Sequence, residues 1–243
     1  MTHAVQSETP PALPLQMVFA QRGFSLTELA VVLVIVALLI GGMLLPLSAQ
    51  QDIAARQDSE KALADIREAL IGFAAANGRL PRPATSATDG TENAANCATD
   101  AACSGFIPWA TLGTAKVDGY GKLIRYSVTP AYANATISLT TTANRTVQTR
   151  DGAGAVVTLA AQVPVVILSH GKGRWGTTDA GTALADGSAT NIDEDANEAG
   201  PTLYFSRQAS DNAATSGGEF DDMVVWISSN ILFNRMISAG RLP

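Results

Sequence analysis

The feature that most restricts this 243-residue chain is a continuous apolar segment at residues 29–47, LAVVLVIVALLIGGMLLPL. About 20 such residues are enough for a helix to cross a bilayer. A helix that is apolar on every side is otherwise buried inside a large protein. A cleavable secretory segment is shorter and ends at a small-x-small site, where this chain has Leu47-Ser48-Ala49 with Leu in a small residue's place. We therefore predict a membrane-spanning helix.

The overall composition excludes several other classes of protein. Apolar residues make up 47% and charged residues 16%, so the chain can fill a core and is not a disordered tail. The formal charge of −6 argues against general nucleic-acid binding, which needs a basic surface. Two cysteines and two histidines are too few for a multi-disulfide scaffold, a four-cysteine zinc site or a His-rich metal site.

The residues just before the apolar segment read Gln21-Arg22-Gly23-Phe24-Ser25-Leu26-Thr27-Glu28. This pattern resembles the class III signal of type IV pilins and pseudopilins. In that family a prepilin peptidase cuts after the glycine, on the cytoplasmic side, and methylates the new N-terminal amine. The resemblance implies a leader at residues 1–23, cleavage between Gly23 and Phe24, and N-methylation of Phe24. Thr27 departs from the pattern, because an apolar residue is common at that position.

The charges around the segment predict its orientation and one assembly contact. Arg22 on the N-terminal flank favours a cytoplasmic N-terminus and an external head. Glu28 is costly at the edge of the hydrocarbon region unless it is paired. A carboxylate in the first turn of a helix interacts favourably with the helix N-terminus, and this is one interpretation of Glu28. The family suggests another, which we favour: Glu28 pairs with the Phe24 amine of a neighbouring subunit and fixes the register of a filament.

The predicted helix continues beyond the apolar segment. From Asp52 onward, apolar residues recur at three- to four-residue spacing, which indicates an amphipathic helix. Asn77-Gly78 is a typical stop, so we place one helix at residues 24–76, within an N-terminal region 24–78. Pro46 removes a backbone donor inside this helix, and it predicts either a local opening or a passive kink.

Residues 79–243 are expected to form a globular head. Their composition shifts to Gly, Thr, Ser, Asn and Asp, with short β-branched runs between turns. Ser229 or Asn230 is expected to cap a short C-terminal helix. The predicted fold class is α+β and pilin-like, with the long helix packed on an antiparallel sheet. The expected strands are 122–128, 136–139, 155–159, 163–168, 202–205 and 223–227.

Two segments of the head extend the family resemblance. The run Asp118-Gly-Tyr-Gly, which continues to Tyr126, looks like the segment that opens the sheet in major-pseudopilin-like proteins, with Tyr120 in place of the usual Trp. The tail from Gly218 to Pro243 resembles the ending of a proteobacterial group of pilin-like proteins. Major pseudopilins bind calcium through carboxylates and carbonyls, and the resemblance implies Asp221 and Asp222 as ligands. Other acidic residues accompany this pair: Asp193, Glu194, Asp195 and Glu198 lie in one expected loop, and Glu219 precedes Asp221. A solvated acidic loop is the alternative.

Cys97 and Cys103 would close a seven-residue loop on the external side of the membrane. An oxidising periplasm makes a disulfide the expected state. A redox pair normally has C-x-x-C spacing, which differs from this one, and half a metal site is the remaining alternative. We predict a structural disulfide that holds a local loop.

Three other sequence patterns have simpler explanations than a functional site. Gly171-x-Gly173-x-x-Gly176 follows an apolar run, but no helix pattern follows it, so a dinucleotide site is not predicted. Ser169-His170 are adjacent, and no nucleophile elbow surrounds them. A locally basic stretch would suit DNA capture only with interleaved aromatic residues, and solvated strand faces explain it better; it comprises Lys116, Lys122, Arg125, Arg145 and Arg150.

These observations predict a structural subunit, a minor pilin or pseudopilin of a type IV pilus or type II secretion filament. The expected partners are other pilin or pseudopilin subunits, the prepilin peptidase and an inner-membrane assembly platform. The expected location is the inner membrane, single-pass, with the head periplasmic, and then the cell surface in the case of a pilus. No enzymatic activity and no certain cofactor are predicted. The alternatives are a bitopic inner-membrane envelope enzyme and a DNA-uptake receptor pilin.

Overall fold

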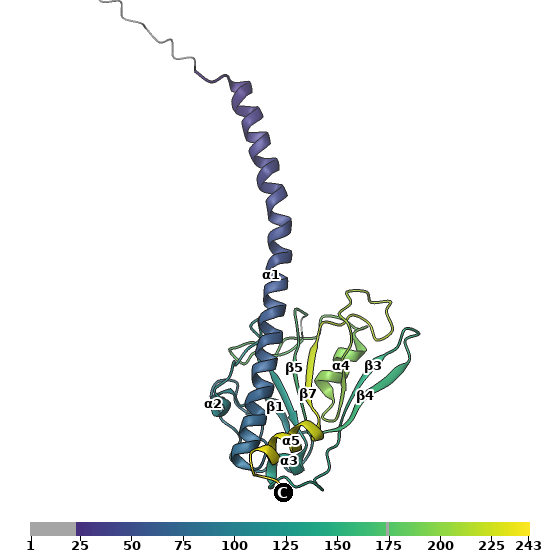
Figure 1. Ribbon diagram of the computed structural model, residues 1–243. Helices are drawn as coiled ribbons and strands as arrows, with labels where there is room; N and C mark the ends of the chain where they lie inside the picture. Colours follow the sequence, from purple (N-terminus) through teal and green to yellow (C-terminus); the bar gives the residue numbers. More distant parts are fainter. Residues whose placement is uncertain (1–22, 174) are drawn as a thin grey trace, which may run out of the picture. The chain divides into compact units, whose positions relative to one another are not determined.

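The structure is a computed structural model that describes residues 23–173 and 175–243. The side chains of residues 42–47 are also outside the described part. The predicted leader lies outside the described residues, apart from Gly23. The chain divides into two compact units, the first ending at Leu47 and the second spanning Ser48–Pro243. The fold class is α+β, as predicted, with the elements labelled in Figure 1.

Helix α1, Leu26–Asn77, is the longest element and enters both units. Its end agrees with the predicted stop, because Gly78 has a φ of 73° and its N–H donates to the carbonyl of Ala74 at 2.8 Å. A left-handed glycine of this kind commonly ends a helix. The helix assignment continues through Pro46. The side chain of Pro46 lies outside the described part, so the opening or kink expected there remains a prediction.

The first unit contains the N-terminal part of α1, and its apolar side chains are exposed. Every described residue from Gly23 to Gly41 is exposed. Leu38, for example, is 72% exposed. Within the described residues, the structure contains no helix whose length and apolar character suffice for a membrane span.

The second unit is built on a four-stranded sheet in the order β1-β2-β5-β7. All neighbouring pairs are antiparallel, as predicted, with Tyr126 opposite Ile167 and Val165 opposite Ile227. Parallel neighbours would have required long crossovers. The strands are Ser104–Phe106 (β1), Arg125–Val128 (β2), Val165–Ser169 (β5) and Met223–Ile227 (β7).

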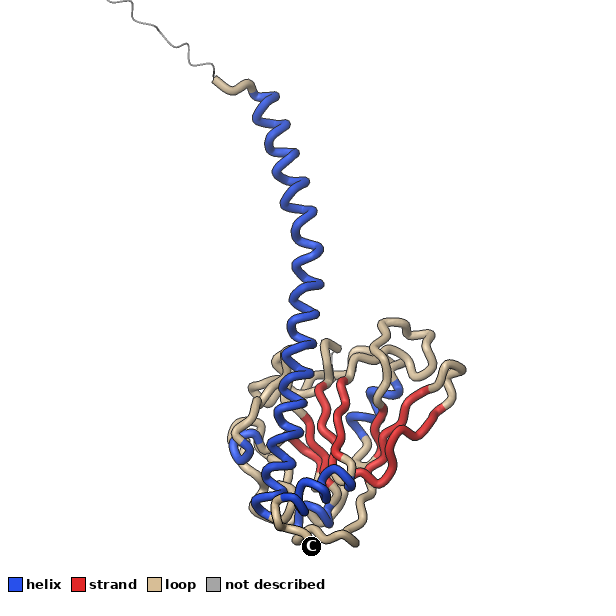
Figure 2. The backbone as a smooth tube through the Cα atoms, viewed as in Figure 1, coloured by secondary structure: helices blue, strands red, loops and turns tan. Residues whose placement is uncertain are grey.

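The C-terminal part of α1 packs on this sheet (Figure 2), and its residues between Leu63 and Ala74 form the main core with it. The predicted apolar stripe is confirmed, since Leu63, Ile66 and Leu70 are at most 1% exposed. The C-terminal helix α5, Ser229–Ser238, adds Leu232 and Met236 to the same core. Its cap is Ser228, whose side chain accepts from the N–H of Ile231. The predicted caps, Ser229 and Asn230, already lie inside the helix.

The loop at residues 118–121 attaches the sheet to the helix. The N–H of Gly119 donates to Ser59 Oγ at 2.9 Å, and Ser59 Oγ donates to the carbonyl of Ala55 at 2.8 Å. A Cβ at Gly119 would overlap that carbonyl group. Tyr120 OH also reaches the carbonyl of Asp52 at 3.5 Å. The Asp-Gly-Tyr-Gly segment therefore holds the helix against the sheet, and its glycine allows the close approach.

A second sheet has the order β4-β3-β6, with β3 antiparallel to β4 and parallel to β6. The head is therefore not one antiparallel sheet. A smaller core that includes Val147, Val166 and Tyr204 contains residues from both sheets. The strands are Arg145–Arg150 (β3), Val156–Val163 (β4) and Leu203–Phe205 (β6), and helix α4, Ile192–Ala199, precedes β6.

Two sequence predictions are wrong in this region. The strand expected at 136–139 is absent from the described residues. Ser138 N–H instead donates to Thr141 Oγ1 at 2.9 Å, and Thr141 N–H donates back to the Ser138 carbonyl at 3.0 Å, which makes a turn. The acidic loop is also partly helical, because α4 covers residues 192–199. Short helices also form at Trp109–Leu112 (α2) and Pro130–Asn134 (α3).

Candidate functional site

The start of α1 is organised by a reciprocal pair of hydrogen bonds. The N–H of Ser25 donates to Glu28 Oε2 at 2.8 Å, and the N–H of Glu28 donates to Ser25 Oγ at 3.2 Å. Ser25 Oγ also donates to Glu28 Oε2 at 2.9 Å. This is a capping box, which satisfies donors that a helix start would otherwise leave unpaired. The sequence Ser-x-x-Glu carried this signal.

The capping box bears on both interpretations of Glu28. The first-turn interpretation has direct contacts, because the carboxylate binds Ser25 within its own chain. Pairing with the Phe24 amine of a neighbouring subunit involves a second chain and stays a prediction. The two are compatible, because a carboxylate has about four lone-pair sites and accepts several donors. Gly23 and Phe24 are both exposed, with Phe24 at 88%.

A second group of candidate residues lies in the head and contains both predicted calcium ligands. Asp221 and Asp222 meet Glu194 of α4, and one carboxylate oxygen of each lies within 4.8 Å of the others. We call these three residues the acidic cluster. A cavity of about 210 Å³ borders Glu194 and Asp221 and is also lined by Asn191 and Glu219. Carboxylate oxygens of this kind are the ligands that calcium prefers, so the donor chemistry fits.

Most carboxylate oxygens of the acidic cluster already have protein partners. Glu194 accepts from the N–H of Asp221 at 2.5 Å and from Asn191 Nδ2 at 3.0 Å. Asp221 Oδ2 accepts from the N–H of Gly173 at 2.5 Å. Asp222 Oδ2 accepts from Asn197 Nδ2 at 2.8 Å. Among the residues that line this cavity, two have a buried side-chain oxygen without a hydrogen-bond partner: Asp221 Oδ1 and Asn191 Oδ1. Calcium at Asp221 and Asp222 remains a prediction.

Two buried cations accompany the acidic cluster. The imidazole of His170 lies between Asp222, at 3.2 Å, and Glu198, at 3.0 Å. Burial lowers the pKa of His170, but the charges of Asp222 and Glu198 outweigh it and raise the pKa to about 9. Lys122 is 5% exposed, and its Nζ donates to the carbonyls of His170, at 3.1 Å, and Gly173. Burial lowers the pKa of Lys122.

Burial and neighbouring charges shift the pKa values of the carboxylates in and near the acidic cluster. Burial and the charge of Asp222 raise the pKa of Glu194 to about 7. The same two causes raise the pKa of Asp221. The ion pair with His170 holds the pKa of Glu198 below its usual value despite burial. The acidic cluster therefore carries more negative charge than its surroundings favour.

The Ser169-His170 pair does not form a nucleophile and its base. Ser169 Oγ donates to Asp118 Oδ2 at 2.6 Å, whereas the His170 ring contacts Asp222 and Glu198. The glycines that follow have a structural explanation as well. A Cβ at Gly171 would overlap Asp221, so this loop needs glycine to wrap around that carboxylate.

The other acidic residues of α4 point to separate partners. Asp193 forms ion pairs with Arg150, at 2.7 Å, and Arg207, at 2.8 Å. Asp195 accepts from Trp175 Nε1 at 3.2 Å. Of the four acidic residues expected in a solvated or calcium-binding loop, Asp193 and Glu194 are buried. Sequence reasoning missed Glu194 as a neighbour of Asp221 because α4 has no apolar pattern.

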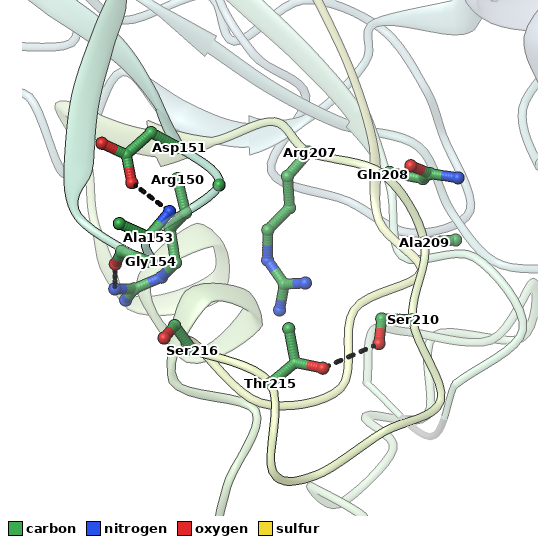
Figure 3. Close-up of a pocket in the computed structure, with 11 residues that line it drawn as sticks. Arg150, Asp151, Ala153, Gly154, Arg207, Gln208, Ala209, Ser210, Thr215 and Ser216 are labelled. Atoms are coloured by element: carbon green, nitrogen blue, oxygen red, sulfur yellow. Dashed lines mark hydrogen bonds between the residues drawn. The ribbon is translucent and has the colours of Figure 1, made fainter.

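A larger cavity of about 470 Å³ lies between the β3–β4 turn and residues 207–216 (Figure 3). The side chains of Arg150 and Arg207 reach it, and Thr215 and Ser210 are joined by a hydrogen bond at 3.3 Å. Both arginines share the carboxylate of Asp193. Their guanidinium groups therefore hold the two loops together.

The basic residues weighed for DNA capture do not form a free cationic surface. Arg145 is fully buried and pairs with Asp100 at 2.5 Å. Lys116 pairs with Asp179, and Arg125 lies 3.9 Å from Glu198. Arg150 and Lys122 are bound as described above. Cations that are buried or paired in this way contribute little to phosphate binding.

The predicted disulfide between Cys97 and Cys103 is present. Both cysteines are at most 1% exposed and belong to the main core. Asn134 holds the loop from α3, because its Nδ2 donates to the carbonyl of Cys97 at 2.8 Å. The bond therefore links a short surface loop to the core.

Comparison with known proteins identifies one feature. Residues 19–44 match the family model described as the prokaryotic N-terminal methylation motif. The match contains Gly23, Phe24 and Glu28 and supports a prepilin signal of the type IV pilin or pseudopilin kind. No curated protein and no solved structure matches the chain.

Proposed function

Starting from the prepilin signal that this chain carries, we propose that it is a structural subunit of a pilin-type filament. Its role would be that of a minor pilin or pseudopilin, in a type IV pilus or a type II secretion filament. The observation that carries the proposal is the methylation motif at residues 19–44, which includes the start of α1, together with the exposure of every described residue of α1 from 26 to 41. Exposed apolar surface on this scale is typical of contact with lipid or with other helices.

The proposal gives each part of the N-terminus a task. Prepilin peptidase would cut between Gly23 and Phe24 and methylate Phe24. Residues 29–47 would hold the subunit in the inner membrane, with the N-terminus cytoplasmic and the head periplasmic. Glu28 would then pair with the Phe24 amine of a neighbour during assembly on the inner-membrane platform. Neutralising both charges removes the cost of an unpaired ion near hydrocarbon.

The mass of the native N-terminal peptide tests the processing step. Protein isolated from the membranes of its own host should begin with N-methylated Phe24. A chain that still begins with Met1 would contradict the proposal and favour a bitopic envelope protein with an uncleaved anchor.

Assembly is tested by two neighbouring variants. Glu28→Ala removes the carboxylate, and we expect incorporation into filaments to fall by roughly 10-fold or more. Ser25→Ala removes the capping hydroxyl but keeps the carboxylate, and it serves as the matched control with a loss below about 3-fold. Equal losses would show that Glu28 acts only through the cap, and normal incorporation of Glu28→Ala would refute the intersubunit pairing.

A further inference from the structure

The cavity between the β3–β4 turn and residues 207–216 has on its wall a guanidinium group with an unused donor (Figure 3). The side chain of Arg207 is only 8% exposed. Its Nε donates to Asp193 Oδ2 at 2.8 Å, and its Nη2 donates to the carbonyls of Gly218, at 2.7 Å, and Glu219, at 3.3 Å. Among the described residues, Nη1 has no acceptor. A largely buried guanidinium group with a free N–H edge suits an acceptor that comes from outside the chain.

The guanidinium group of Arg207 is held in place within the head. It stacks over the ring of Phe220, with 4.5 Å between Cζ and the ring centroid. The carboxylate of Asp193 is 1% exposed and is shared with Arg150, whose Nε and Nη2 bind its two oxygens. Two arginines thus contact one carboxylate, and this group of three side chains carries one positive charge in excess. A cation that is already ordered loses little conformational entropy when it binds an anion.

Hydroxyl groups make up much of the remaining cavity wall. Thr215 and Ser210 are joined by a hydrogen bond at 3.3 Å. A Cβ at Gly154 would overlap Ser216 Oγ, so this glycine lets the two loops approach each other. Gln208 adds an amide group to the lining. Hydroxyl and amide groups both donate and accept, and they are suited to exchange hydrogen bonds with the hydroxyl groups of a ligand.

A carboxylate on the opposite loop limits which anions fit the cavity. Asp151 belongs to the β3–β4 turn, and its Oδ1 accepts from the N–H groups of Ala153 and Ala155, at 2.9 Å each. It would repel a polyanion such as a nucleic-acid strand, because like charges placed close together are costly. A ligand hydroxyl can instead donate to it. The cavity therefore suits a small molecule with one acidic group and several hydroxyl groups.

We propose that this cavity binds an acidic sugar unit, a hexose ring that carries a carboxylate. Nη1 of Arg207 would donate to the ligand carboxylate, and Asp151, Thr215 and Ser216 would bind ring hydroxyls. The cavity volume of about 470 Å³ lies within the range of small-molecule sites, roughly 300–1,000 Å³. This inference concerns the head alone and does not depend on the filament function proposed above.

Titration calorimetry of the full chain tests this inference, in a polyoxyethylene detergent because its headgroup contains no sugar. The probes are sodium glucuronate, glucose and sodium acetate, at matched ionic strength. Glucuronate should bind with a Kd of about 1 mM or below, and glucose and acetate should bind at least about 10-fold more weakly. Glucose or acetate binding as tightly as glucuronate would overturn the proposal. So would a chain that binds no glucuronate at roughly 10 mM.

Variants of the cavity wall locate the site. Thr215→Val removes one lining hydroxyl and should weaken glucuronate binding by about 3- to 10-fold. The matched control is Thr140→Val, which removes an exposed hydroxyl bonded to Ser138 Oγ at 3.0 Å, away from the cavity lining, and it should bind as the wild type does. Arg207→Lys keeps the charge but loses the planar group, and it should weaken binding by about 10-fold or more.

The threonine pair keeps the test decisive if Arg207→Lys fails to fold, because Arg207 also holds Asp193. Equal glucuronate affinities of Thr215→Val and Thr140→Val would overturn the assignment of the ligand to this cavity. A folded Arg207→Lys chain with wild-type affinity would overturn the role of the guanidinium group.

Discussion

Helix α1 presents two kinds of apolar surface, and the contrast separates folding from assembly. Between residues 63 and 74 the apolar side chains form one stripe and are buried against the sheet and α5. Between residues 24 and 41 every described side chain is exposed, including Val34 at 60%. A helix with one apolar stripe buries it against a single neighbour, whereas a helix that is apolar on every side needs lipid or protein all around it. The first region serves the head, and the second is the region we expect to contact other molecules.

The largest expected effect on stability comes from a variant in the buried part of α1. Leu70→Ala removes a fully buried side chain from the core, and it should lower the free energy of unfolding of the head by about 2–5 kcal/mol. Leu38→Ala, in the exposed region, should leave that free energy unchanged. Chemical denaturation of the full chain in detergent measures both. A similar loss for Leu38→Ala would show that residues 24–41 also stabilise the head.

The second largest effect is expected at Gly119, in the loop that attaches α1 to the sheet. Gly119→Ala would place a Cβ against the carbonyl of Ala55. Since both groups belong to backbone, we expect a loss of about 3 kcal/mol, the upper end of the range for overpacking. Gly152→Ala is the matched control, because its Cβ would enter open space. Equal denaturation midpoints for the two variants would refute the docking role of Gly119.

The disulfide should contribute less and act locally. Replacing Cys97 and Cys103 by serine should lower stability by roughly 2 kcal/mol, the value for a short closed loop. The unfolding transition should remain a single cooperative step, since the core has other contacts. Loss of cooperative unfolding in the double serine variant would show instead that the bond holds the whole head together.

The smallest effect concerns the end of the helix and depends on pH. Arg79 pairs with Glu92 at 2.7 Å and stacks over the ring of Phe73. Its hydrogen bond lowers the pKa of Glu92 in the folded state. The resulting stability is present above the unfolded pKa, about 4.3, and is lost as the pH falls through the lower folded value.

Thermal unfolding across acidic pH checks this prediction. Glu92→Gln should reduce the drop in Tm that the wild type shows below about pH 5. Arg79→Gln should do the same, because it returns the pKa of Glu92 toward its usual value. An unchanged acid response in both variants would remove this pair from the acid sensitivity of the head.

Local signals predicted some elements of this fold well. Strand β7 spans 223–227 as expected, because its apolar run is bounded by polar residues and turns. The end of α1 was found from Asn77-Gly78. Strand β3 was missed, since its charged ends, Arg145 and Arg150, resemble a solvated segment. Arg145 is instead fully buried and neutralised by Asp100, which lies 45 residues away in the sequence.

The sequence predicted only part of the candidate site as well. Asp221 and Asp222 were found from a resemblance to a sequence pattern, but the third member of the cluster comes from α4. Neither the approach of Glu194 nor the burial of Lys122 leaves a local signal, because both depend on tertiary packing. The cysteine pair was predicted from the sequence, since a separation of six positions between Cys97 and Cys103 closes a short local loop.

Both residues of the capping box lie on the mature side of the proposed cleavage point. Removing the leader would leave the first turn of α1 intact, so the new terminus would emerge on a preformed helical rod. The carboxylate already contacts the N–H of Ser25, which is adjacent to the liberated amine. Ser25 would thus hold the Glu28 carboxylate in a fixed position before the amine of a neighbouring subunit reaches it.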